Sequence, residues 1–147
     1  AETEIQVKDK SNSLLRLARC CAPVKGEPII GYITAGKGVT IHARRCPRVT
    51  KETLAPERIV EVVWGAVAQD HYKAGLIIRS LDTTGQLARI TAAISDLGGD
   101  ITKAEVETTP DRRARIRVSL RIRDIQELLA IEKAVAAIPD VQTVERT

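Results

Sequence analysis

The chain has 147 residues, enough for one ordinary domain or two small ones, and 44% of them are hydrophobic. Charged residues make up 29%, which argues against long disorder, and no apolar run approaches the roughly 20 residues of a membrane span. One Trp, two Tyr and no Phe disfavour a protein that stacks nucleic-acid bases on rows of aromatic side chains. The chain starts with Ala and contains no Met, so we expect it to be part of a longer protein.

The net charge of +4 is concentrated in the first part of the chain. Residues 1–64 hold 11 lysines and arginines against seven acidic residues, whereas residues 65–147 hold 12 of each. An acidic partner is therefore expected to bind the first part.

Residues 1–64 predict a mixture of short strands and turns. Residues 13–19 fit a strand or a short helix, and residues 44–54 a short helix. Ala35-Gly36-Lys37 predicts the turn of a hairpin. The predicted strands are 4–8, 29–34, 38–42 and 58–64.

Three cysteines and one histidine in this part predict a metal site. Cys20 and Cys21 are adjacent, and Cys46 follows His42 by four residues. Adjacent cysteines pair poorly and an odd count leaves one thiol over, so a disulfide framework is a poor explanation. Three thiolates and an imidazole complete a tetrahedral, structural shell for Zn²⁺ and leave no position for a substrate. The spacing is also compatible with cysteines buried as small hydrophobic side chains.

A linker over 65–73 precedes a more regular pattern. In chain order we predict strand 74–82, a helix with an apolar stripe at Leu87, Ile90, Ile94 and Leu97, strands 101–109 and 113–123, a helix from Asp124 to Pro139, and strand 140–146. The order β-α-β-β-α-β predicts a ferredoxin-like sandwich. The fold class is therefore α+β, a small zinc-binding α/β module followed by this sandwich.

Arginines alternate along the strand 113–123, which invites a nucleic-acid interpretation. Lys103, Glu105 and Glu107 alternate on the neighbouring strand, however, so we predict a solvated sheet face with cross-strand ion pairs. The loop 82–87 offers a glycine and the start of a helix, whose free N–H groups suit a small carboxylate.

Two segments resemble known domains. The segment Leu14–Val49, which contains the run ARCCxPxxGxxIxGxxTxGxGxxIHxxxCP, resembles the zinc-finger, or conserved-cysteine, module of long stringent-response proteins of the RelA/SpoT family. Leu76–Asp111 resembles the ACT domain that follows this module in the family. The resemblance divides the chain into a zinc-finger domain (1–64), a linker (65–73) and an ACT domain (74–147).

The resemblance implies a cytoplasmic regulatory fragment without catalytic residues of its own. The parent would be a GTP/GDP pyrophosphokinase and (p)ppGpp hydrolase, controlled through contacts with its own catalytic domains and with ribosomes, rRNA and uncharged tRNA. Cys20, Cys21, His42 and Cys46 match the family's structural Zn²⁺ ligands. A homodimeric ACT domain would bind an amino acid, plausibly branched-chain, at Asp82, Gly85, Gln86, Leu87, Ile101 and Thr102.

The chain departs from the family pattern at three places. Arg45 stands where an Asp often precedes the last Cys, and Ala43 where an Arg commonly follows the His. The usual Asp-Arg-x-Gly of the ACT loop is Asp82-Thr83-Thr84-Gly85. The change at Arg45 removes the carboxylate through which an inter-domain or RNA contact would run.

Two alternatives remain open on the sequence. The ACT domain could be a ligand-free module for dimerisation or autoinhibition. A free-standing metalloenzyme would need an open coordination position and a nearby acid or base, and Glu27 is the one carboxylate close to the metal motif.

Overall fold

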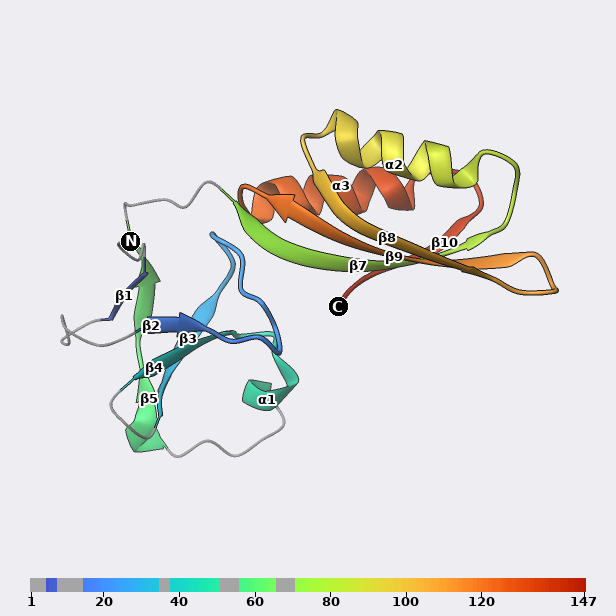
Figure 1. Ribbon diagram of the computed structural model, residues 1–147. Coiled ribbons are helices and arrows are strands. Elements are labelled where there is room, and N and C mark those ends of the chain that lie inside the picture. Colours follow the sequence, from blue (N-terminus) through green and yellow to red (C-terminus); the bar gives the residue numbers. More distant parts are fainter. Residues whose placement is uncertain (1–4, 8–14, 35–37, 51–55, 66–70) are drawn as a thin grey trace. The chain divides into compact units, whose positions relative to one another are not determined.

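The computed structural model describes residues 5–7, 15–34, 38–50, 56–65 and 71–147. The chain divides into two compact units, Ala1–Asp70 and His71–Thr147, which we call the first unit and the second unit (Figure 1). None of the described helices combines the length and the apolar composition required to cross a bilayer.

The described residues of the first unit form two small sheets. Its four-stranded sheet has the order β2-β4-β3-β5, and a separate pair joins β1 to β6. The elements are β1 (Ile5–Val7), β2 (Leu15–Leu17), β3 (Ile29–Ile33), β4 (Val39–Ala43), α1 (Pro47–Thr50), a 3-10 turn (Pro56–Arg58), β5 (Ile59–Val60) and β6 (Val62–Trp64). Ile29, Val39, Ile41 and Val62 form its aliphatic core.

The predicted hairpin is confirmed, since β3 and β4 pair antiparallel; its turn at 35–37 lies outside the described residues. Residues 15–17 adopt the strand alternative. The single strand predicted over 58–64 is wrong: β5 pairs with β3, whereas β6 pairs with β1. Two separate partners require the chain to break at Glu61, which local patterning does not reveal.

The second unit is a βαββαβ sandwich. Its antiparallel sheet has the order β10-β7-β9-β8, and both helices cover one face (Figure 1). Large aliphatic side chains from β7, β9, α2 and α3 are fully buried between helices and sheet. The elements are β7 (Tyr72–Leu81), α2 (Gln86–Asp96), β8 (Asp100–Thr108), β9 (Arg113–Ile122), α3 (Ile125–Ala136) and β10 (Val141–Arg146).

The apolar stripe predicted for α2 is only half correct. Ile90 and Ile94 are fully buried, but Leu87 and Leu97 are 42% and 40% exposed. The helix α2 contacts β8, one of the two outer strands, and Leu97 lies just after the last residue of the helix. The strand β7 also begins at Tyr72, within the segment predicted as linker.

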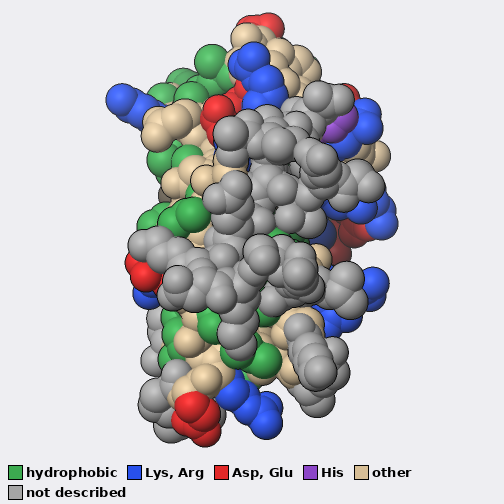
Figure 2. Space-filling model, turned by 90° about the vertical axis from the view of Figure 1, so that its left-hand side faces the viewer, with side chains coloured by type: hydrophobic (Ala, Val, Ile, Leu, Met, Phe, Trp, Pro, Cys, Tyr) green, Lys and Arg blue, Asp and Glu red, His purple; other side chains and the backbone are tan. Residues whose placement is uncertain are grey.

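Cross-strand ion pairs form at two positions of the arginine row of β9, in line with the predicted sheet face. Arg115 pairs with Glu107 at 3.5 Å and Arg121 with Asp100 at 2.6 Å. A bulge between Ile101 and Lys103 shifts the register so that Asp100 lies opposite Arg121. Elsewhere on the described surface, Figure 2 shows basic and acidic side chains beside each other.

Candidate metal centre

Parallel pairing of β2 with β4 brings the cysteine pair to the histidine. Leu17 lies opposite Ile41, and the N–H of Ala18 donates to the Ile41 carbonyl at 2.8 Å. The chain then turns at residues 19–21, so Cys20 and Cys21 lie beside His42, the next residue of β4. The ladder thus joins two motifs that are about twenty residues apart.

Cys46 reaches the same point through a tight turn after β4. Its N–H donates to the Ala43 carbonyl at 3.0 Å, and α1 begins at the next residue, Pro47. The arrangement places Cys46 before a short helix and His42 on a strand, so residues 42–46 do not form one helical turn.

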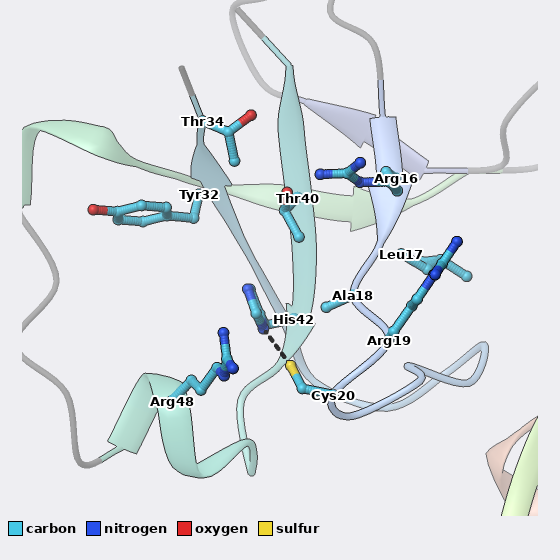
Figure 3. A pocket seen from close by; sticks show the side chains of 10 residues that line it. All are labelled: Arg16, Leu17, Ala18, Arg19, Cys20, Tyr32, Thr34, Thr40, His42 and Arg48. Atoms are coloured by element: carbon cyan, nitrogen blue, oxygen red, sulfur yellow. Dashed lines mark hydrogen bonds between the residues drawn. The ribbon is translucent and has the colours of Figure 1, made fainter. Parts of the chain in front are cut away.

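The four side chains have the dimensions of a tetrahedral metal shell. Cys20 Sγ lies 3.4 Å from His42 Nδ1 (Figure 3). Cys20 Sγ also lies 3.6 Å from Cys46 Sγ and 4.0 Å from Cys21 Sγ, and Cys21 Sγ lies 3.8 Å from His42 Nδ1. All four ligand atoms lie within 4.8 Å of one another. Typical Zn–S and Zn–N bonds give tetrahedral edges of about 3.8 Å between sulfurs and about 3.6 Å between sulfur and nitrogen. The cluster could therefore hold a metal ion.

Burial sets the protonation of the thiols. Burial, opposed by the Ala43 N–H, raises the pKa of Cys21 to about 12, and burial together with the neighbouring Cys46 raises the pKa of Cys20. Burial also opposes ionisation of Cys46, but the N–H of Arg48 and the neighbouring thiols lower its pKa overall. A cation that takes thiolates would therefore displace protons from Cys20 and Cys21 at neutral pH.

A buried ion pair supports the loop that carries Cys21. Glu27 is 5% exposed; one carboxylate oxygen accepts from the Val24 N–H at 2.5 Å and the other from Arg45 Nε at 3.0 Å. The Arg45 guanidinium also donates to the Cys21 carbonyl at 2.6 Å. Arg45 thus contacts the cysteine loop of its own unit. These contacts occupy both oxygens of Glu27, the carboxylate that a metalloenzyme would have needed as acid or base.

The predicted amino-acid contacts lie at two ends of the second unit's sheet. Asp82, Gly85, Gln86 and Leu87 follow the end of β7, where Leu81 pairs with Arg113. Ile101 and Thr102 lie at the start of β8, where Ile101 pairs with Leu120, which in turn pairs with Ala74. Within one chain the structure does not bring the two groups together.

Gln86 is committed to contacts inside the unit. It is 3% exposed, and its amide nitrogen donates to Ser80 Oγ at 2.8 Å and to the Pro139 carbonyl at 2.9 Å. Its amide oxygen accepts from Arg89 Nε at 3.1 Å. These bonds hold the loop 82–87 against the turn before β10, a role that the sequence did not indicate.

The fold and the cluster define a two-unit α+β protein: a small unit around a Cys₃His cluster, followed by a ferredoxin-like βαββαβ sandwich. The model of the RelA/SpoT RIS domain matches residues 5–65, and that of the ACT domain matches residues 68–146. The chain belongs to the RelA/SpoT family and comprises its regulatory RIS and ACT domains.

Relatives of known name span the same two domains. The chain is 35% identical to a GTP pyrophosphokinase of Streptomyces coelicolor, over 99% of this chain and 17% of the relative. It is 31% identical to the bifunctional (p)ppGpp synthase/hydrolase RelA of Mycobacterium tuberculosis and 28% to SpoT of Escherichia coli, in each case over 97% of this chain and 19% or 20% of the relative. The chain thus spans about a fifth or less of these relatives.

Among solved structures, the ACT domain from GTP pyrophosphokinase of Chlorobium tepidum is 22% identical in sequence, with a TM-score of 0.48. The match covers 52% of this chain and 99% of that one. The strand order and register of the second unit by themselves identify its ferredoxin-like fold.

Proposed function

We propose that this chain senses amino acids for a (p)ppGpp synthase/hydrolase and controls the catalytic domains of that protein. The RIS and ACT domains support a regulatory role. Because the relatives are named as a GTP pyrophosphokinase and a (p)ppGpp synthase/hydrolase, we propose the same activity for the parent protein. The parent would act in the cytoplasm, where thiols stay reduced. It would engage ribosomes that carry uncharged tRNA, with the basic first unit contacting rRNA.

Zn²⁺ is the cation that we propose for the cluster. Three thiolates and one imidazole are a common ligand set of structural zinc, and the observed spacings match its tetrahedron. When bound, zinc would link the turn after β2, which carries Cys20 and Cys21, to His42 on β4 and to Cys46 in the turn after β4. The role is structural, because four protein ligands leave no position for a substrate.

The amino-acid proposal rests on one observation: the predicted contact residues of the loop 82–87 are far from Ile101 and Thr102 within one chain. The strand β8 is one of the two outer strands of this sheet, and Val106 on it is 43% exposed. A second copy that pairs its β8 antiparallel to the first, about a two-fold axis, would bring its loop 82–87 beside Ile101 and Thr102 of the first copy. The ligand site would thus be completed by dimerisation.

The chemistry of the two groups fits a branched-chain amino acid. The start of α2 presents N–H groups to a carboxylate, and Gly85, at φ 77°, caps the helix without a side chain that would compete. Asp82 would attract the ammonium group. Leu87, which is exposed, and Ile101 of the partner copy would contact an aliphatic side chain.

Analytical ultracentrifugation and calorimetry test this composite site. We expect the chain to dimerise and to release heat with valine, isoleucine or leucine. The variant Val106→Arg should be monomeric and should lose that heat, because it places a charge at the β8 edge. Leu129→Arg is the matched control, since Leu129 is 49% exposed on α3 and should leave both properties unchanged.

Two results would contradict the proposal in different ways. A monomeric wild type that binds valine would refute the composite site while keeping the sensing role. A dimer that gives no heat with any amino acid would favour the alternative, a ligand-free module for dimerisation or autoinhibitory contact with the catalytic domains.

A further inference from the structure

A pocket of about 580 Å³ opens beside the metal cluster in the first unit (Figure 3). Two of the metal ligands, Cys20 and His42, form part of its wall. Three arginines also line it, Arg16 from β2, Arg19 from the cysteine turn and Arg48 from α1. We call this site the arginine pocket.

The arginine pocket carries a net positive charge. Among the described residues that line it, none is acidic, and no described carboxylate forms an ion pair with any of the three arginines. The arginine row of the second unit differs, because Arg115 and Arg121 there each have an acidic partner. A zinc ion with three thiolates and a neutral imidazole would carry about −1, so the pocket would keep about +2 when the metal is bound.

The remaining wall supplies the other groups that recognise a nucleotide. Guanidinium groups bind phosphate through paired N–H donors. Thr34 and Thr40 offer hydroxyl groups, although Thr34 already donates to the Gly38 carbonyl at 3.1 Å. Tyr32 is half-buried at the side of the pocket and presents an aromatic ring on which a base can stack (Figure 3).

We propose that the arginine pocket binds the phosphate group of a nucleotide, with Arg16 and Arg48 as its principal ligands and Tyr32 beside the base. The phosphate can belong to an RNA strand or to a free nucleotide. For an RNA strand, the inference rests on the RNA role proposed above and assigns it to particular residues. The amino-acid role of the second unit is independent of it.

Fluorescence anisotropy with a labelled single-stranded RNA 12-mer tests the pocket in the zinc-loaded chain. Removing two charges with Arg16→Gln/Arg48→Gln is expected to weaken binding about tenfold and to reduce the slope of log affinity against log salt by about 1.4. The matched control is Arg44→Gln/Arg58→Gln, which removes two exposed charges of the same unit outside the pocket. The control should weaken binding much less.

Competition by AMP and by inorganic phosphate identifies the source of the phosphate. Displacement of the RNA by AMP would indicate a free nucleotide, and displacement only by unlabelled RNA would indicate a strand; either supports the pocket. NMR amide shifts of the wild type under the same probes need no variant, and the largest are expected at Arg16, Thr40 and His42.

Equal weakening by the two double variants would overturn the assignment to this pocket while leaving a charge-driven RNA role intact. NMR amide shifts confined to residues outside the pocket would likewise overturn the assignment to this pocket. Absence of any binding to RNA or AMP by the wild type would overturn both the pocket and the RNA role.

Discussion

At the scale of single residues, the pair formed by Glu27 and Arg45 decides how the cysteine loop is held. Glu27 lies within the fold with 4% of its side chain exposed, and the Arg45 side chain is 38% exposed. A buried carboxylate is tolerated only when a cation and hydrogen-bond donors compensate its desolvation. Arg45 and the Val24 N–H provide both.

Arg45→Ala is expected to destabilise the first unit by about 1–2 kcal/mol, because it leaves the Glu27 carboxylate buried without its cation. The Arg45 side chain is partly exposed, and solvent screening keeps this effect below that of a fully buried ion pair. Urea unfolding followed by Trp64 fluorescence measures the change, since Trp64 is the one tryptophan and donates to the Glu27 carbonyl at 3.0 Å. Arg44→Ala, the exposed neighbour, should change stability by less than about 0.5 kcal/mol. Equal effects of the two variants would contradict the structural role of the pair.

At the scale of elements, α3 shows how local sequence specifies a helix start. Asp124 precedes Glu127 by three residues, the spacing of a capping box, and Asp124 Oδ1 accepts from the Glu127 N–H at 2.9 Å. The return bond runs one residue further back than usual, because Glu127 accepts from the N–H of Arg123 at 3.2 Å and from its guanidinium at 2.7 Å. The bond from the Glu127 N–H satisfies one of the N–H groups that a helix start leaves without partners.

Asp124→Ala should destabilise the second unit by about 1 kcal/mol through loss of this cap. Thermal unfolding monitored by far-UV circular dichroism gives the change. Asp96→Ala, at the C-terminal end of α2, is the control; removing a negative charge there should be neutral or slightly stabilising, because the helix dipole is negative at that end. If Asp96→Ala destabilised the second unit as much as Asp124→Ala, the assignment of Asp124 as a helix cap would be contradicted.

At the scale of the whole molecule, the two units depend on different sources of stability. The aliphatic side chains buried in the second unit form a core between two helices and a four-stranded sheet. The first unit has a small aliphatic core and a second cluster made of Ala18, Ala43 and the cysteines Cys21 and Cys46. We therefore expect metal binding to contribute to folding of the first unit alone.

Elemental analysis of the purified chain should find zinc, and a strong chelator should remove the unfolding transition of the first unit while that of the second unit remains. Trp64 fluorescence follows the first unit, and calorimetry records both transitions. Restoring zinc should restore the lost transition. A chain that is free of metal and still shows a cooperative Trp64 transition would contradict the structural role of the metal.

The order of the elements in the second unit could be predicted because its signals are local. Two-residue alternation along β9, the glycines after α2 and the capping box of α3 act between neighbours in the sequence. The contacts that were missed link distant segments: the parallel pairing of β2 with β4, the division of residues 58–64 between two sheets, and the pair of Glu27 with Arg45. The residues that form these contacts are far apart in the sequence, and no local pattern in the residues between them indicates that they meet.

The sequence by itself determined which residues could ligate a metal, the α+β class and the family, because motif chemistry and periodicity are written in neighbouring positions. Only the tertiary structure decided that four candidate ligand atoms meet within 4.8 Å, that three arginines line one pocket, and that the residues predicted to contact an amino acid lie at opposite ends of a sheet. Distances between segments remote in the chain are set by strand register and packing, which depend on the whole fold rather than on any local run of residues.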